Sequence, residues 1–205
     1  MTGAPFELPL RCRCGYVRGV AREVSRSAGF RFACYCTDCQ AFARFLKRPD
    51  VLDAAGGTDI FQMPPARVTF SVDAHALRCL HLNDSTKVLR WYAQCCRTPL
   101  ANTAASPRFP VVGLIHSFMD TEVKGRSRDE VLGPPLCRIY ERSAAGALPP
   151  TAPPSASFGA FAKRGAKVLG WRVRGLNWPN PFFDAATGAP LSAPPVVTPD
   201  EHVAI

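Results

Sequence analysis

The sequence contains no long apolar segment. Its longest uncharged stretch, residues 143–162, carries four prolines and many small residues, so it is typical of a linker and not of a membrane helix. The first residues, MTGAPFELPLRCRCG, lack the basic segment and following apolar run of a secretory signal. We therefore expect no membrane partner and a cytoplasmic location, a reducing compartment in which disulfides are rare.

Acidic residues are missing from a long C-terminal stretch. None occurs between Glu141 and Asp184. Six basic residues lie in the same stretch: Arg142, Lys163, Arg164, Lys167, Arg172 and Arg174. This stretch supplies most of the net charge of +9, and it favours an anionic partner. A recognisable nucleic-acid motif with interleaved, exposed aromatic residues is also missing, which argues against nucleic acid as that partner.

The length and composition indicate one folded domain with an extension. The chain has 205 residues, of which 47% are hydrophobic, enough for a core. We divide it into a lead-in (1–10), a cysteine-containing domain (11–142), a Pro/Ala-rich linker (143–155) and a basic extension (156–205). We expect the extension's large aromatic residues to pack on the domain, since exposed apolar surface costs about 25 cal/mol per Å². They are Phe158, Phe161, Trp171, Trp178, Phe182 and Phe183.

Alternation of apolar and polar residues predicts a mainly β fold. In GFRFACYC, Phe30, Phe32, Cys34 and Cys36 share one face of a strand. The segments ARVTFSV, LRCLHL, TKVLRWYA and LCRIYE predict further strands. The segment VVGLIHSF is apolar on both faces and predicts a central strand.

Helices are expected in only two places. The segment CQAFARFLK places Phe42, Phe45 and Leu46 on one side and ends before Pro49, which predicts one short helix. A weaker helical pattern covers about residues 156–174 of the extension, where several glycines interrupt it.

Three cysteines follow one another closely in CYCTDC. Cys34 and Cys36, two residues apart on a strand, project to the same side, and a turn at Thr37 and Asp38 can bring Cys39 back toward them. Three thiolates bind zinc but leave its tetrahedral coordination incomplete. The spacing therefore predicts a catalytic zinc with an open fourth position.

A second set of cysteines is split along the chain. Cys12 and Cys14 form another C-x-C unit, and Cys95 and Cys96 can complete a four-thiolate, structural zinc site from about 80 residues away. Alternatively, only one of Cys95 and Cys96 binds the metal while the other is buried. The competing interpretations, buried apolar cysteines or disulfides, suit the ordered spacing less well. Two further cysteines are expected in the core: Cys79 and Cys137.

The combined pattern resembles a known family. The order is C-x-C-G, then C-x-C-x-x-C, then a GGTDIF turn, then an aromatic strand that leads into CCRTPL. Over about residues 10 to 140 it is similar to the glutathione-dependent formaldehyde-activating enzymes, whose superfamily includes centromere protein V. The resemblance implies a β-tent of antiparallel sheets stapled by zinc, with two zinc ions per chain and a thiol substrate at the Cys34–Cys39 site.

The chain departs from the family's pattern at its third motif. The family shows C-x-x-C-G-T, whereas here Ala93 stands at the first cysteine position, Cys96 at the second, and Arg97 replaces the glycine. Cys95 can take over the missing ligand role. Two other conceivable substitutes are His81 and His116.

The preferred hypothesis is a zinc-dependent carbon–sulfur lyase or thiol-adduct enzyme that acts on a small, glutathione-like thiol conjugate, with glutathione as a possible co-substrate. Bound zinc would lower the pKa of the substrate thiol. Arg44, Lys47 and Arg48 are candidates to offset the negative charge of the site, and Asp38 is a candidate to move a proton.

The alternative hypothesis is a non-catalytic, zinc-stapled interaction module whose basic extension binds acidic protein or nucleic acid. The two hypotheses differ in what they predict for added thiol and for salt. Only the enzyme requires a thiol to reach the metal, and only the module requires binding that weakens steeply as salt is raised.

Overall fold

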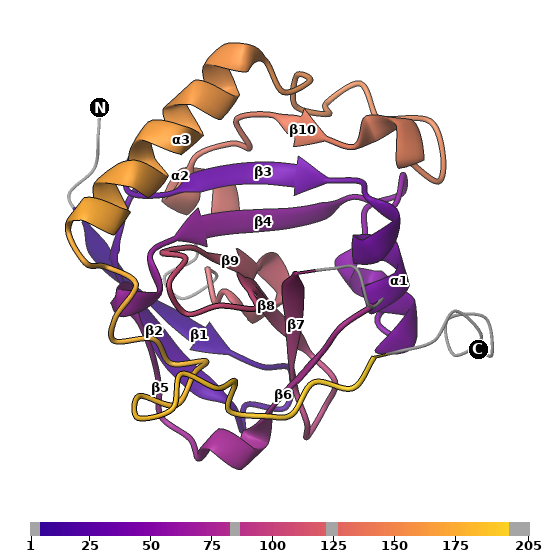
Figure 1. Ribbon diagram of the computed structural model, residues 1–205. Helices are drawn as coiled ribbons and strands as arrows, with labels where there is room; N and C mark the ends of the chain where they lie inside the picture. The colour runs from indigo at the N-terminus through magenta and orange to yellow at the C-terminus, as the bar shows by residue number, and fades with distance from the viewer. Residues whose placement is uncertain (1–4, 83–86, 122–126, 197–205) are drawn as a thin grey trace.

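The protein is built around two β-sheets (Figure 1), and its computed structural model describes residues 5–82, 87–121 and 127–196. The smaller sheet has the order β1-β2-β5 and the larger β10-β3-β4-β9-β8-β7-β6. The smaller sheet comprises β1 (Phe6–Arg11), β2 (Arg18–Val24) and β5 (Val68–Phe70). The larger comprises β3 (Phe30–Cys34), β4 (Thr58–Met63), β6 (Leu77–Leu80), β7 (Val88–Ala93), β8 (Pro99–Ala104), β9 (Val112–Ile115) and β10 (Arg138–Ile139). The mainly β class predicted from the sequence is confirmed.

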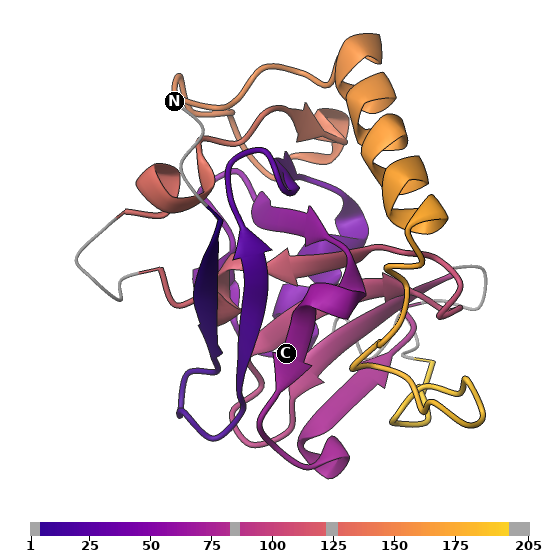
Figure 2. The same ribbon diagram turned by 90° about the vertical axis from the view of Figure 1, so that its left-hand side faces the viewer.

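Among the described strands, the pairs are antiparallel with one exception. β10 pairs with β3 in parallel, Arg138 opposite Ala33 and Ile139 opposite Cys34, so a purely antiparallel arrangement is wrong at this edge. β9 lies between β4 and β8 and is buried throughout, as its apolar sequence predicts. Figure 2 shows β1 and β2 side by side on the face turned to the viewer.

The lead-in expected over residues 1–10 is wrong from Phe6 onward, because β1 begins there. Leu8 and Leu10 are buried and pair with Ala21 and Gly19 of β2. Pro9 obscures this strand in the sequence, but β1 is the edge of its sheet, where a proline is tolerated.

The described part of the chain also contains three α-helices. α1 (Thr37–Phe45) follows β3, α2 (Arg128–Leu132) is a single short turn, and α3 (Phe158–Val173) lies in the extension. Figure 1 shows α1 at the C-terminal end of β3 and α3 across its N-terminal end. None of the helices in the described parts of the chain is long and apolar enough to cross a membrane.

The extension is part of the main core. The Phe182 ring lies between Phe70 (ring centroids 5.3 Å apart) and Trp91 (5.1 Å), and it is fully buried. Residues 143–155, expected to be a linker, run along the β domain, where the Ala145 N–H donates to the Ala55 carbonyl (2.9 Å).

The aromatic residues of the extension do not all pack as predicted. Trp171 is buried against the domain, but Phe158 is 88% exposed and Phe161 is also exposed. The helical period explains the difference, because Phe158 points about 140° away from Trp171 around the axis of α3.

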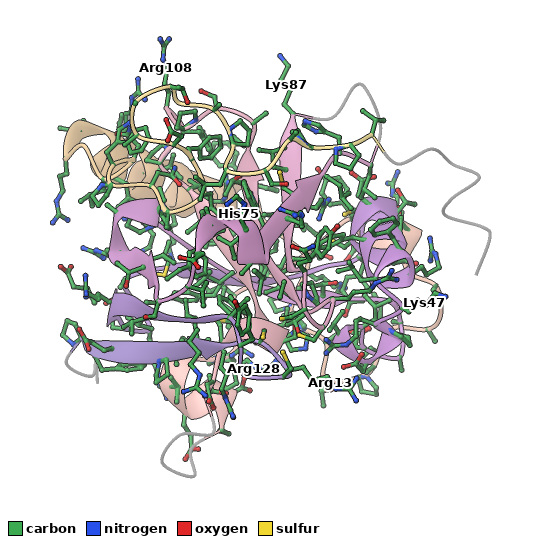
Figure 3. All side chains as sticks on the ribbon, turned by 90° about the horizontal axis from the view of Figure 1, so that it is seen from below. Arg13, Lys47, His75, Lys87, Arg108 and Arg128 are labelled. Atoms are coloured by element: carbon green, nitrogen blue, oxygen red, sulfur yellow. The ribbon has the colours of Figure 1, made fainter. Side chains whose placement is uncertain are left out.

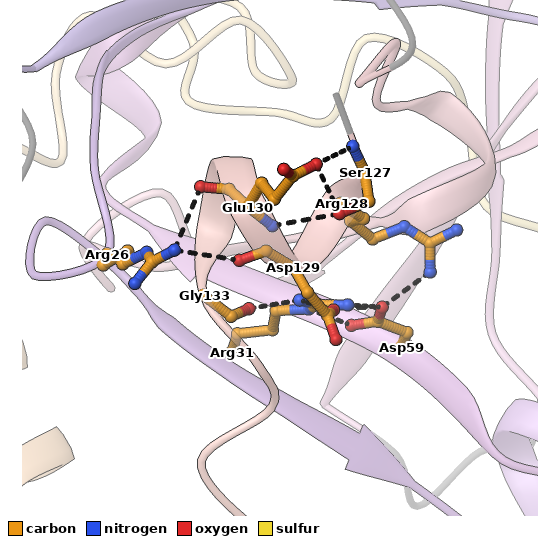
Figure 4. Close-up of polar contacts among 8 residues, drawn as sticks. All are labelled: Arg26, Arg31, Asp59, Ser127, Arg128, Asp129, Glu130 and Gly133. Carbon is orange, nitrogen blue, oxygen red and sulfur yellow. Dashed lines mark hydrogen bonds and ion pairs between the residues drawn. The ribbon is translucent and has the colours of Figure 1, made fainter. Parts of the chain in front are cut away.

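A buried arginine ties α2 to the larger sheet (Figure 4). Arg31 of β3 contacts Asp59 of β4 (Nη2 to Oδ2, 2.6 Å) and Asp129 of α2 (Nη1 to Oδ1, 2.7 Å), while Arg128 contacts the same Asp59 oxygen (2.7 Å). Ser127 caps the helix. Burial raises the pKa of Asp59, but its hydrogen bond and ion pair with Arg31 outweigh this and hold that pKa below its usual value. Asp59 is therefore a carboxylate at neutral pH, and it compensates the buried guanidinium.

Candidate metal centres

Four cysteines from two turns meet at one point, as the sequence predicts. Cys12 and Cys14 lie in the turn between β1 and β2, and Cys95 and Cys96 lie in the turn between β7 and β8. The sulfur of Cys95 is 3.8 Å from that of Cys12, 3.3 Å from that of Cys14 and 3.7 Å from that of Cys96. Four sulfurs around one zinc at 2.3 Å are about 3.8 Å apart. The spacing is therefore close to that of a tetrahedral site and much longer than a disulfide bond.

Both members of the Cys95–Cys96 pair belong to this cluster, so both sulfurs are placed where they could bind a metal. Ala93 ends β7 and is fully buried, paired with Leu77, so it takes no part in the cluster. Arg97 adopts a left-handed backbone (φ 55°) and donates its N–H to the Ala93 carbonyl. This turn places the sulfurs of both Cys95 and Cys96 in the cluster. His81 and His116 do not join the cluster.

The buried Thr98 hydroxyl organises this centre. It accepts hydrogen bonds from the Arg13 backbone N–H (3.0 Å) and from the Arg48 guanidinium (3.1 Å), and it lies 3.1 Å from the Cys96 sulfur. Its first two partners can only donate, so its own proton is directed at the sulfur. Burial raises the pKa of Cys96, but this hydrogen bond and those from backbone N–H groups outweigh it and lower the pKa to about 6.

The second set of cysteines lies where β3 meets α1. Cys34 ends the strand, Cys36 is the N-cap of the helix, and Cys39 lies in its first turn. The predicted two-residue turn is wrong in its form, because Thr37 and Asp38 already begin α1. The outcome is nevertheless the predicted one, since the three sulfurs gather within 4.8 Å of one another.

Local structure prepares one of these sulfurs to carry negative charge. Cys36 accepts a hydrogen bond from the Cys39 backbone N–H (3.4 Å), and the Cys34 sulfur lies 3.3 Å away. Hydrogen bonds from the Cys34 and Cys39 thiols lower the pKa of Cys36, and the same contact with Cys36 raises the pKa of Cys34. A thiolate at a helix N-terminus is further stabilised by the helix dipole.

The cation of this centre is Arg90, which the sequence did not single out. Its side chain is only 7% exposed, and its Nη1 atom donates to the Cys39 sulfur (3.3 Å) and to Asn102 Oδ1 (3.3 Å). Its Nη2 atom lies 3.5 Å from the Asp38 carboxylate. Arg90 and Asn102 are opposite each other on β7 and β8, so strand register sets their contact.

The cations predicted for this centre lie elsewhere. Arg44 and Lys47 are exposed, and Figure 3 shows Lys47 at the surface. Arg48 is buried but contacts Thr98 and so belongs to the four-cysteine centre. The helix begins at Thr37, which makes Arg48 follow its C-terminal end and point away from the cysteines at its start.

A cavity of about 450 Å³ borders the three-cysteine centre. Its wall includes all three cysteines together with Asp38, Arg90 and Asn102. The rest of the lining includes apolar side chains and residues of β10 and the segment after it, namely Phe32, Ile60, Ile139, Tyr140 and Ser143. A small molecule in this space would contact the sulfurs directly.

The GGTDIF turn supports the strand that carries Cys34. Thr58 pairs with Cys34 across β3 and β4. A side chain at Gly57 would lie 2.5 Å from Asp53 Oδ2 and 2.6 Å from the Tyr35 ring, while the Tyr35 hydroxyl donates to that same Asp53 oxygen (2.9 Å). The glycine therefore allows Tyr35, just after Cys34, to pack against this turn.

Both cysteine sets fit a metal such as zinc. Their donors are all thiols, which soft or borderline metals prefer, and the sulfurs converge without forming disulfides. Cys79 and Cys137 lie outside both sets and are buried, as predicted.

Comparison with known proteins places the chain in a family without assigning an activity. No curated protein matches the sequence. The resemblance to the glutathione-dependent formaldehyde-activating enzymes stays a prediction. One family model matches residues 6–192, a span that includes α3 and the core aromatic residues that follow it. The chain therefore belongs to DUF6151, a family of unknown function.

Proposed function

We propose that the chain is a zinc-dependent enzyme that forms or breaks a carbon–sulfur bond of a small thiol at the Cys34–Cys36–Cys39 centre. In this proposal the Cys12–Cys14–Cys95–Cys96 centre holds a second, structural zinc. The observation that carries the proposal is the difference between the two sets: four sulfurs close one, whereas three sulfurs border a cavity of about 450 Å³ in the other.

The metal would supply one kind of chemistry. Zinc held by Cys34, Cys36 and Cys39 would leave a fourth position for a substrate sulfur and would lower the pKa of that thiol. In the addition direction, the substrate thiol loses its proton and its sulfur forms a bond to a carbonyl carbon. The π electron pair of the carbonyl moves to its oxygen, and the oxygen takes up a proton. The lyase direction reverses these changes.

The protein's own groups have distinct parts in this proposal. Arg90 stabilises the negative charge that three thiolates bring to a buried site, because it donates directly to the Cys39 sulfur. Asn102 turns its oxygen to Arg90, which leaves its amide N–H groups to donate to a substrate carbonyl oxygen. Asp38 lines the cavity and can hold or give the proton that the oxygen exchanges.

Cobalt substitution tests whether a thiol reaches this centre. We expect added glutathione to change the thiolate-to-metal charge-transfer band of the cobalt-loaded protein. The response should be lost in Cys39→Ser and kept in Cys79→Ser, a matched change at a buried cysteine outside both sets. A charge-transfer band that does not change when thiols are added, in a folded protein with both metals bound, would refute the proposal. Formation of a glutathione–formaldehyde adduct, followed by NMR, then tests turnover.

One observation favours the second candidate function, a non-catalytic interaction module. Phe158, Leu169 and Val173 are all more than half exposed on α3, and the helix carries no acidic residue. An apolar face beside exposed cations suits an acidic protein partner. Binding of polyglutamate that weakens steeply with salt, without any cobalt response to thiols, would favour this function over the enzyme.

A further inference from the structure

A second cavity adjoins the one at the three-cysteine centre. It has a volume of about 210 Å³, and the two cavities share four lining residues: Phe32, Gln62, Ile139 and Tyr140. Its remaining wall comes partly from α3, through Ala160, Phe161 and Arg164. The extension thus closes a space that continues from the cysteines along β3 and β4.

The far end of this space carries an arginine without an acidic partner. Arg164 donates through Nε to Gln62 Oε1 (2.5 Å), and no carboxylate among the described residues forms an ion pair with it. It is half-buried, and burial lowers its pKa. Its two Nη groups are left to bind a ligand anion, and the planar guanidinium suits a carboxylate.

The register of β3 and β4 gives the distance between the two ends. Gln62, the partner of Arg164, lies opposite Phe30, whereas Thr58 lies opposite Cys34. Four residues of strand separate these positions, which is about 13 Å. The apolar part of the wall along this length includes Phe30, Phe32, Ile139 and Phe161. A ligand that reaches both ends therefore needs a thiol at one end, a carboxylate at the other and an apolar chain in the middle.

We infer that the Cys34–Cys36–Cys39 centre acts on thiols that carry a carboxylate at the far end of an apolar chain, and that Arg164 of α3 binds this carboxylate. The inference rests on the proposed function for its thiol end but not for its carboxylate end. It assigns α3 a part in substrate selection, and it favours such a thiol over the more polar glutathione.

Four probes separate the two ends of the ligand. 8-Mercaptooctanoate has both groups, and 8-mercaptooctanol has only the thiol. Octanoate has only the carboxylate, and octanol has neither group. Each acid is compared with its alcohol. Calorimetry on the zinc-loaded full chain measures each affinity. We expect the carboxylate to improve binding about 10–100-fold in both comparisons, the gain typical of a hydrogen bond between charged groups. 8-Mercaptooctanoate should also bind more tightly than glutathione.

Matched variants assign the effect to one residue. Arg164→Gln should abolish the advantage of octanoate over octanol, whereas Lys163→Gln, at the neighbouring exposed cation, should keep it. Octanoate and octanol binding equally well to the parent protein would overturn the inference even if Arg164→Gln does not fold. An advantage that survives in folded Arg164→Gln would also overturn it. Because octanoate has no sulfur, its binding supports the Arg164 site even if thiols fail to reach the metal. Conversely, a cobalt response to 8-mercaptooctanol without a carboxylate advantage would keep the proposed function and refute this inference.

Discussion

Replacement of Arg90 with methionine should weaken metal binding at one centre only. The substitution removes the charge that contacts the Cys39 sulfur and keeps an unbranched side chain in a buried position. Opposite charges about 4 Å apart attract by about 4 kcal/mol at an effective dielectric constant of 20, and part of this is offset by the cost of burying the guanidinium. We expect zinc affinity to fall about 10–100-fold, as when other groups that contact metal ligands are removed.

Arg48→Met is the matched control, since Arg48 reaches the other centre through Thr98 and Cys96. Competition of the zinc-loaded protein with a chromophoric chelator measures zinc affinity. Cys39→Ser isolates the four-cysteine centre, and its difference from the protein with both centres gives the affinity of the three-cysteine centre. Arg90→Met should weaken zinc binding by Cys34, Cys36 and Cys39, and Arg48→Met should weaken it at the four-cysteine centre. Unchanged affinity of the three-cysteine centre in Arg90→Met would refute the assigned role of this arginine.

Two further pairs of substitutions test the fold. Asp59→Asn should destabilise the protein by about 3–5 kcal/mol in urea unfolding at neutral pH, because it leaves the buried Arg31 charge under-compensated, while Asp129→Asn, at a 62% exposed partner, should cost about 1 kcal/mol or less. The pKa of Asp59 is lowered in the folded state, so the stabilisation by its carboxylate is present above the unfolded pKa and disappears as the pH falls through the folded pKa. The loss of unfolding free energy in Asp59→Asn should therefore become smaller in acid. Equal losses at neutral and acidic pH would contradict the assignment. Phe182→Ala should lower the free energy of unfolding by about 3–5 kcal/mol, whereas Phe158→Ala should change it by less than about 0.5 kcal/mol. Similar melting temperatures for the two variants would show that the extension is not part of the core.

Local spacing made the clustering of the cysteines predictable. Cys34, Cys36 and Cys39 are close in sequence, so a strand followed by a tight reversal brings them together whether the reversal is a turn or, as found, the start of α1. Cys12 and Cys14 needed partners from a distant segment, and the only other clustered thiols were Cys95 and Cys96. The choice between these last two depended on turn geometry that the sequence did not reveal.

The charged groups around the centres could not be predicted in the same way. Arg90 lies 51 residues from Cys39, and only the register of β7 with β8 and the packing of α1 bring them together. Arg31 occupies a polar position of an alternating strand, a pattern that usually indicates solvent, but α2 covers it. Arg48 followed the cysteine motif in sequence yet points to the other centre.

The metal content of the purified protein tests the central claim most directly. Elemental analysis of folded protein, prepared without chelator, should give two zinc ions per chain, because seven thiols converge in two separate sets. Cys39→Ser should lose one zinc with little change in melting temperature, whereas Cys14→Ser should destabilise the fold, since a structural zinc contributes folding free energy. One zinc or fewer in the folded parent protein would contradict the account.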